Sequence, residues 1–227
     1  MELLDLPLFP LGTVQFPGYG LPLHIFEERY KALIADCMMG AGRFGVVGIE
    51  HGVEVGGAAQ PYRVGTLAQI TELDRLADGQ CTLLAAGLER IRILDLDRTG
   101  KPYLRGRVEL WPDEDLPAAP GADSAQVGAL FNAYLGTVLD AAGGQAAEWG
   151  LELPLDLPAD PRLLSALIGA LIQASPADKQ RLLEAPSAGA RITAEIALLT
   201  RELTLMKTTQ AAPAPNPAGL RGAFSNN

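Results

Sequence analysis

The chain has 227 residues, of which 48% are hydrophobic and 20% are charged, and its formal net charge is −9. This composition is that of an ordinary globular protein, and the length suffices for one large domain or two small ones. The acidic balance disfavours generic binding to nucleic acid or to an anionic membrane surface. No segment approaches the ~18 consecutive apolar residues that a membrane span requires.

The two cysteines and the opening residues bear on the cellular compartment. Cys37 and Cys81 lie far apart and form no CxxC motif, so we expect neither a disulfide framework nor a zinc ribbon. The opening residues have no basic segment followed by an apolar one, which argues against a signal peptide. A reducing, cytoplasmic location is therefore expected.

Residues 1–115 are predicted to form a β-rich domain with one helix. Apolar residues recur at helical spacing from Phe26 to Cys37, and Gly40 and Gly42 end that segment. Before it, four prolines favour short edge strands and turns over a central strand: Pro7, Pro10, Pro17 and Pro22. After it come short β-type runs separated by turns, which indicate a small barrel or curled sheet: Phe44–Ile49, Tyr62–Leu73, Thr82–Leu88, Glu89–Asp95 and Leu104–Leu110.

Residues 116–207 are predicted to form a helical bundle. The acidic, proline-rich segment from Trp111 to Gly121 is the best domain boundary. The pattern then changes to a 3.6-residue period, with capping signals for the second and third of four helices at Asp160-Pro161 and Ser175-Pro176. Residues 208–227 have almost nothing to bury, so we expect a disordered tail.

Motifs for catalysis or cofactor binding are weak in this chain. The GxGxxG match from Gly40 to Gly45 is predicted to have a helix before it and a strand after it, which is the reverse of a phosphate-binding turn. We therefore interpret it as the C-terminal cap of a helix followed by the start of a strand. No GxxxxGK[ST] motif occurs, and neither histidine stands at metal-ligand spacing. Ser175 and Lys179 are spaced as a dyad, but Ser175 stands where a helix cap is expected. We therefore expect no enzyme, cofactor or metal, and keep a hydrolase as a weaker alternative.

A group of basic residues stands out within the acidic chain. If the runs Glu89–Asp95 and Leu104–Leu110 pair as a hairpin centred near Arg98, four arginines share one face and oppose one another: Arg90, Arg92, Arg105 and Arg107. Such a face needs carboxylates or an anionic ligand. Pairing with acids of the same chain is favoured over a ligand site, and a one-residue change of register moves two of the arginines to the other side.

Several blocks of sequence, in order, resemble the Lon N-terminal substrate-binding domain. They lie at Leu6–Gly12, Phe16–Gly18, Leu21–Glu27 with Tyr30, Val64–Ile70, Gly87–Ile93, and Pro102–Leu104 with Arg107-Val108. The resemblance covers about residues 4–207. It implies an α+β fold, with a PUA-like β-barrel subdomain carrying one helix, followed by an α-helical bundle. It also implies a stand-alone recognition module without the ATPase and protease domains of Lon.

Recognition without catalysis suggests binding of unfolded or apolar polypeptide segments, as an adaptor that presents them to an ATP-dependent protease or a chaperone. Aromatic and apolar residues near glycines and prolines are the expected anchors, although packing in the core is equally expected of them: Phe16, Tyr19 and Leu21, with Tyr62 and Tyr103 as weaker candidates. The alternative is binding of RNA or another anionic ligand through the four arginines, by analogy among PUA-like folds. The oligomeric state and the client stay open.

Overall fold

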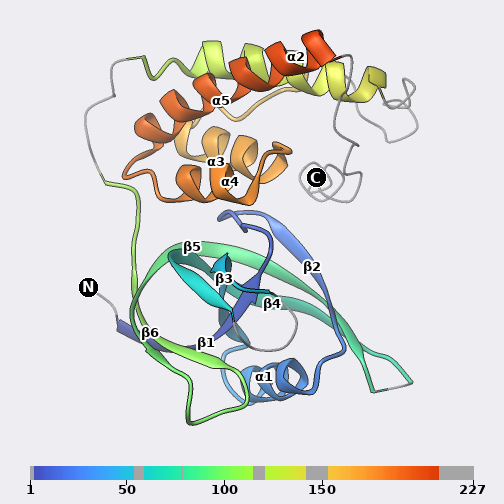
Figure 1. The fold of residues 1–227 in the computed structure, drawn as a ribbon, viewed down its shortest axis with the longest axis vertical. Coiled ribbons are helices and arrows are strands. Elements are labelled where there is room, and N and C mark those ends of the chain that lie inside the picture. The colour runs from blue at the N-terminus through green and yellow to red at the C-terminus, as the bar shows by residue number, and fades with distance from the viewer. Residues whose placement is uncertain (1–2, 54–58, 78, 115–120, 142–152, 210–227) are drawn as a thin grey trace. The chain divides into compact units, whose positions relative to one another are not determined.

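The computed structural model describes residues 3–53, 59–77, 79–114, 121–141 and 153–209 (Figure 1). The strands in these ranges are β1 (Leu3–Leu11), β2 (Gly20–Ile25), β3 (Arg43–His51), β4 (Gln60–Arg75), β5 (Cys81–Asp97) and β6 (Leu104–Leu110). The helices are α1 (Glu28–Met38), α2 (Ser124–Ala141), α3 (Pro161–Leu171), α4 (Pro176–Leu183) and α5 (Ala188–Thr209). No helix among the described residues is long and apolar enough to cross a membrane.

The chain divides into two compact units, neither of which is continuous in sequence. Unit 1 comprises Met1–Pro112 and Ala174–Glu184, and unit 2 comprises Asp113–Gln173 and Ala185–Asn227. The predicted change from strands to helices is therefore confirmed, and so is the α+β class. The predicted tail from 208 lies almost wholly outside the described residues.

Unit 1 is built on a curled mixed sheet. The strand order is β2-β5-β4-β3-β1-β6, and β5 also pairs with β6. Only the β1–β3 pair is parallel. The first half of the long strand β5 pairs with β2 and its second half pairs with β6, so β5 changes neighbour along its length. The β5–β6 pairing brings the last strand of the order back to β5, so the sheet curls, and β2 lies outside this curl. The result is a curled mixed sheet and not the closed barrel that was expected.

The prolines of β1 explain why the prediction for this segment was only partly right. β1 is not an edge strand, since it lies between β3 and β6 in the sheet order. However, its residues 3–8 pair with β6 and its residues 8–11 pair with β3. Pro7 and Pro10 each have a partner on one side only, so the missing N–H of each proline can face the unpaired side. The prediction holds for Pro22, because β2 stands at one end of the sheet.

The inside of the curl is filled by a cluster of aliphatic side chains centred on Leu8. Leu8 is the one residue of β1 that pairs on both sides, with Gly45 of β3 and Leu104 of β6, and it is fully buried. Cβ atoms added at Gly45 and Gly106 would lie 2.6 Å and 2.7 Å from the methyl groups of Leu8. The two glycines therefore make the space that Leu8 occupies.

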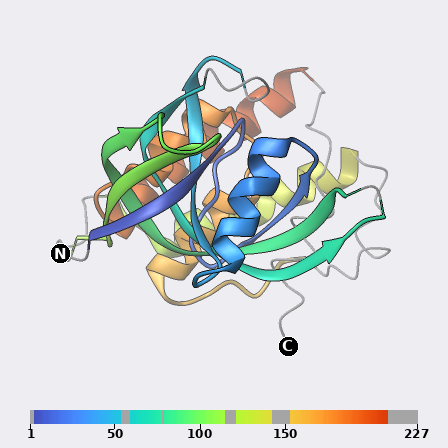
Figure 2. The same ribbon diagram turned by 90° about the horizontal axis from the view of Figure 1, so that it is seen from below.

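The other face of the sheet is covered by α1, which lies across the strands (Figure 2). Four side chains on one side of the helix are buried against it: Tyr30, Leu33, Ile34 and Cys37. The Tyr30 ring stacks on Phe9 with the ring centroids 4.0 Å apart. After the helix, the amides of Gly40 and Gly42 bond back to the Cys37 carbonyl, so the GxGxxG segment is a helix end as predicted.

The helix α4 completes unit 1, whereas the sequence pattern placed it in a bundle with the other three late helices. Gln180 Nε2 donates to the Val64 carbonyl at 3.0 Å, and Arg90 Nη1 donates to the Leu183 carbonyl at 2.7 Å. Both polar side chains are almost fully buried. Buried donors of this kind need acceptors. The sheet supplies the acceptor for Gln180 of α4, and α4 supplies the acceptor for Arg90 of the sheet.

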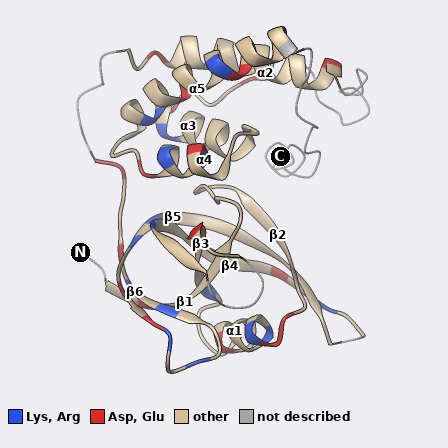
Figure 3. Cartoon of the chain, viewed as in Figure 1, with Lys and Arg blue, Asp and Glu red and all other residues tan. Residues whose placement is uncertain are grey.

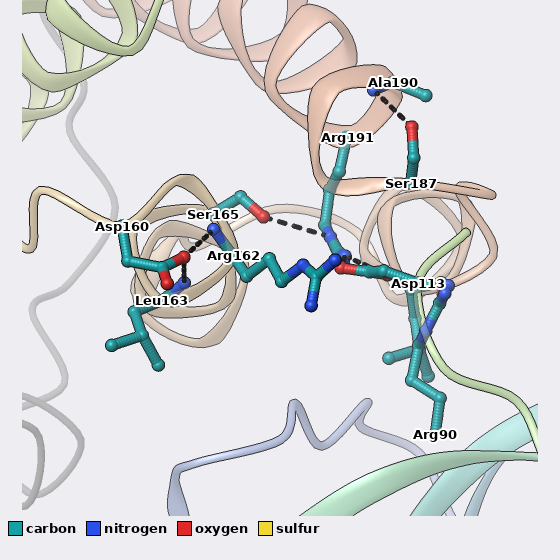
Figure 4. A network of polar contacts seen from close by, with 10 residues as sticks. Arg90, Asp113, Asp160, Arg162, Leu163, Ser165, Ser187, Ala190 and Arg191 are labelled. Atoms are coloured by element: carbon teal, nitrogen blue, oxygen red, sulfur yellow. Dashed lines mark hydrogen bonds and ion pairs between the residues drawn. The ribbon is translucent and has the colours of Figure 1, made fainter. Parts of the chain in front are cut away.

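Unit 2 contains α2, α3 and α5, and its local signals match the sequence. The Asp160 carboxylate accepts from the amides of Arg162 and Leu163 at the start of α3, directly before Pro161 (Figure 4). Asp123 Oδ1 likewise accepts from the amide of Gln126 at 3.0 Å at the start of α2. Both caps occupy helix N-terminal amides that would otherwise lack partners.

A buried ion pair links Asp113, in the segment that follows β6, to α5, the last helix of unit 2. Arg191 on α5 binds both carboxylate oxygens of Asp113, at 2.7 Å and 2.8 Å through Nη2, and its Nε donates to Ser165 on α3 (Figure 4). The Arg191 side chain is 4% exposed. A bidentate pair with a further hydrogen bond is the arrangement that offsets the cost of burying a charge.

A second buried carboxyl group in unit 2 has no such compensation. Glu195 on α5 is fully buried, and neither of its carboxylate oxygens has a hydrogen-bond partner among the described residues. Burial raises its pKa well above the ordinary 4.5, against an opposing effect of Arg191. The folded chain therefore holds this group protonated at pH values at which the unfolded chain ionises it.

We predict that Glu195→Gln stabilises the protein near neutral pH. Because the folded pKa is raised, the stability of the wild type falls as pH rises above 4.5 toward the folded value, and glutamine removes that loss. Unfolding midpoints measured across this pH range should diverge as pH rises and converge toward pH 4.5. Glu202→Gln on the same helix is the control for net charge, and an equal divergence in it would contradict the assignment.

Candidate functional site

The helix α1 has a pocket on each side. Arg29 and Tyr30 of α1 line one pocket, while Lys31, Ile34 and Ala35 line the other. The buried side of α1 fixes the helix on the sheet between them. We name the pocket lined by Arg29 and Tyr30 the basic pocket, and the pocket lined by Lys31, Ile34 and Ala35 the apolar pocket.

The apolar pocket lies between α1 and the hairpin of β4 and β5, and has a volume of about 180 Å³. Its lining combines aliphatic side chains with the Cys81 thiol: Ile34, Ala35, Leu73, Leu76 and Cys81, with Lys31, Arg75, Gly79 and Gln80 around them. Leu76, beside the hairpin turn, is 42% exposed. An apolar side chain from another molecule can therefore enter and remove apolar surface from water.

Two cations, and no acid among the described residues, belong to the lining of the apolar pocket. Lys31 forms an ion pair with Glu28 at 2.9 Å, and Arg75 lies on β4 opposite Cys81. Burial raises the pKa of Cys81, while Arg75 and Lys31 act in the opposite direction. The thiol is therefore a weakly polar part of the wall, and its burial disfavours the reactive thiolate.

The basic pocket lies on the other side of α1, and its volume is about 90 Å³. Its lining brings together cations and aromatic rings from distant parts of the chain: Pro10, Arg29, Tyr30, Ala59, Arg98, Lys101, Pro102, Tyr103 and Leu104. Arg29 forms an ion pair with Glu27 at 3.0 Å, and its guanidinium lies 4.3 Å from the Tyr30 ring centroid. Arg98 Nη2 donates to the Ala59 carbonyl at 3.2 Å.

Asp36 on α1 links this pocket to the loop before β6. It pairs with Lys101 Nζ at 2.8 Å and accepts a hydrogen bond from the Tyr103 hydroxyl. These two hydrogen bonds, first Lys101 and then Tyr103, hold the pKa of Asp36 below its ordinary value. Burial first, and then the bond to Asp36, raise the pKa of Tyr103. The tyrosine thus stays a hydrogen-bond donor that positions the loop.

The register of β5 and β6 differs from the one expected for the arginine hairpin. The pairs are Arg92 with Glu109, Asp95 with Arg107 and Asp97 with Arg105, and Asp5 of β1 lies on the other side of Arg107. Acidic and basic residues therefore alternate across the strands (Figure 3). The expected opposition of arginines is wrong, because a shift of four to five residues places an acid opposite each of three arginines. Anion binding by this set stays a prediction.

The fourth arginine is part of the interior of unit 1. Arg90 is 3% exposed. The guanidinium carbons of Arg90 and Arg92 both lie 4.3 Å from the centroid of the Trp111 ring. Such cation–π contacts stabilise the end of β6 against β5. Arg90 and Arg92 therefore have a structural role beside Trp111.

The five predicted peptide anchors do not converge on one surface. Phe16 and Tyr103 are 1% and 5% exposed, so the expectation of accessible rings is wrong for both. Tyr19, Leu21 and Tyr62 are half-buried. Burial raises the pKa of Tyr19 to about 12, and Leu21 packs against the core under α1. A peptide-binding role for these three stays a prediction, and of the five only Tyr103 lines either pocket beside α1.

The structure gives no support to the serine–lysine dyad. The hydroxyl of Ser175 donates to Asp178 Oδ2 at 2.8 Å and accepts from the Asp178 amide at 3.1 Å. Ser175 is thus engaged as the cap of α4, as its sequence context indicates. Among the residues that the structure describes, no cluster of histidine, cysteine and acidic side chains could hold a metal ion.

Comparison with known proteins places this architecture in a family. Residues 5–201 match the family described as the ATP-dependent protease La (LON) substrate-binding domain. The Lon protease 1 of Herpetosiphon aurantiacus is 29% identical over 214 residues, which cover 92% of this chain and 25% of the relative. The Lon protease of Anaeromyxobacter dehalogenans is 30% identical, covering 89% and 24%. The chain spans about a quarter of the length of these curated relatives.

Solved structures agree on the fold. The Lon N-terminal domain protein from Xanthomonas campestris superposes with a TM-score of 0.62 at 26% identity, covering 86% of this chain and 98% of that one. The N-terminal domain of the Mycobacterium avium complex Lon protease shares the fold, with a TM-score of 0.60 at 19% identity. The fold is that of Lon N-terminal domains, and the chain belongs to the Lon substrate-binding domain family.

The alternating charges on β1, β5 and β6 can be tested by reversal. Arg107→Glu places a like charge between Asp5 and Asp95, and should lower the free energy of unfolding by a few tenths to about 1 kcal/mol at low salt. Adding Asp95→Arg should recover part of the loss, because the pair is then restored in the opposite sense. Denaturant unfolding at low and high salt measures both, and an additive second loss would contradict the register.

Proposed function

We propose that this chain binds polypeptide segments through the apolar pocket, without a catalytic step, and acts as an adaptor that presents them to an ATP-dependent protease. The observation that carries the proposal is the partly exposed aliphatic lining between α1 and the hairpin of β4 and β5. The membership in a substrate-binding family supports it. The reduced, buried cysteines fit the expected cytoplasmic location.

The size of the apolar pocket suits one side chain. Its volume of about 180 Å³ is comparable to the ~150 Å³ of an engineered apolar cavity that binds benzene. Burying one aliphatic or small aromatic side chain contributes about 1.5–3 kcal/mol. That contribution alone gives weak binding. A segment bound here is thus held loosely, which suits a module that samples many unfolded clients before passing them on.

The proposal that no catalytic step occurs rests on the two side chains that could serve as nucleophiles here. Ser175, the candidate from the sequence, is occupied in capping α4, and burial raises the pKa of Cys81 in the apolar pocket. The region matched in the Lon relatives is a substrate-binding domain and about a quarter of their length. Activity, if it accompanies this chain, is therefore proposed to reside in a partner.

We predict that substitutions at the apolar pocket weaken peptide binding while matched substitutions elsewhere do not. Leu76→Ser removes aliphatic surface at the pocket and should weaken binding of a fluorescent, leucine-rich peptide about tenfold, as judged by anisotropy. Ala35→Phe should weaken it similarly by filling the pocket from α1.

The control is Leu94→Ser, because Leu94 lies on β5, is 45% exposed and does not line the pocket. Thermal unfolding confirms that each variant is folded. Equal affinities of wild type, Leu76→Ser and Ala35→Phe would show that the peptide binds elsewhere, and equal losses in all three variants would indicate a non-specific effect.

A further inference from the structure

The basic pocket is the strongest feature that polypeptide binding leaves unused. Its cations come from two separate segments: Arg29 from the start of α1, and Arg98 and Lys101 from the turn between β5 and β6. Among the described residues of its lining none is acidic, although the chain carries a net charge of −9. A local excess of positive charge in an acidic protein attracts anions to one place.

Each cation is held in position by a contact at the side of the pocket. Arg29 pairs with Glu27, Lys101 pairs with Asp36, and Arg98 donates one N–H group to the Ala59 carbonyl. These contacts use part of the donor capacity, since a guanidinium has five N–H donors and an ammonium has three. The side chains are thus oriented before any ligand arrives, which reduces the entropy lost on binding.

The donors around the pocket favour an anion that accepts several hydrogen bonds. Within the lining stand three cations, of which Arg29 is paired with Glu27 and Lys101 with Asp36. Arg105 adds a further positive charge that acts on Asp36. A carboxylate needs a single guanidinium fork, whereas a phosphoryl group presents three oxygens that can accept from donors converging from several directions.

The walls set the size and character of the ligand. Tyr30, Tyr103 and Pro102 line a space of about 90 Å³ that is open to solvent. Tyr103 is fixed through its hydroxyl to Asp36, and Tyr30 is stacked on Phe9. A rigid space of this size admits a group of a few heavy atoms and excludes a nucleobase or a helix.

We propose that the basic pocket binds a phosphoryl group, with Arg98 and Lys101 donating to its oxygens and Arg29 adding charge from α1. The site is separate from the apolar pocket and its occupation does not depend on the proposed function. The phosphoryl group belongs to a small phosphorylated molecule, to free phosphate or to a phosphorylated side chain, which share the same chemistry at the pocket.

The test is a titration of the full chain with inorganic phosphate at constant ionic strength, followed by amide chemical shifts. The pH is held about 1.5 units above the second pKa of ≈ 6 of a phosphate ester. We expect saturable shifts around Arg29 and from Arg98 to Tyr103. Arg98→Ala and Lys101→Met should each weaken binding about tenfold or more, because a hydrogen bond to a charged group is lost.

The matched control is Arg63→Ala, which removes the same charge from an exposed position on β4 outside this pocket. Its affinity for phosphate should stay within about twofold of the wild type, as expected for an exposed charge that does not line the pocket. An equal loss in Arg98→Ala and Arg63→Ala would show a general effect of charge. Absence of saturable shifts, or equal saturation by acetate at the same ionic strength, would also overturn the proposal.

Two further ligands distinguish the source of the phosphoryl group. Glycerol phosphate represents a small molecule, and a phosphoserine peptide is compared with its unphosphorylated form. Tighter binding of the phosphopeptide than of free phosphate, with no binding of the unphosphorylated form, supports the site and assigns it to a modified polypeptide. Equal binding of free phosphate and glycerol phosphate supports the site and assigns it to small molecules.

Discussion

The architecture of unit 1 depends on the packing of Leu8 between two glycines. β1 can pair with β3 on one side and β6 on the other only where these strands approach closely, and at that point Gly45 and Gly106 leave room for the Leu8 side chain. A methyl group on either glycine would meet the leucine well inside contact distance. The resulting curl buries one aliphatic cluster inside the sheet and leaves the opposite face to be covered by α1.

The position of α1 then determines both pockets. The helix is held by Tyr30, Leu33, Ile34 and Cys37, which are all buried in one cluster with the sheet. Because successive residues turn by 100°, the same helix presents aliphatic groups to the hairpin of β4 and β5 on one side and a cation to the turn after β5 on the other. Binding groups carried by a rigid helix are better preorganised than groups carried by loops. One packing interaction therefore supports two chemically different surfaces.

Local signals predicted the elements well, and long-range pairing explains what they missed. Asp160-Pro161 and Ser175-Pro176 identify helix starts because capping involves only a few neighbouring residues. The predicted register of β5 and β6 was wrong, because the true register depends on a β-bulge between Ile93 and Asp95 and on pairing across strands. The basic pocket was missed for a similar reason: Arg98 and Lys101 belong to the basic segment noted in the sequence, but Arg29 joins them from about 70 residues away, and no local pattern indicates that.

The place of α4 shows how the sheet of unit 1 and the late helices are combined in one chain. The chain leaves unit 1 at Pro112, returns at Ala174 to add α4, and leaves again after Glu184. Without α4, the buried Arg90 would lose the Leu183 carbonyl and the Val64 carbonyl would lose Gln180, and unsatisfied buried groups of this kind are costly. The sheet that carries both pockets is therefore completed by a helix encoded more than 60 residues later. This interdependence gives a physical reason for the family match to continue past the end of the strands and to include α4.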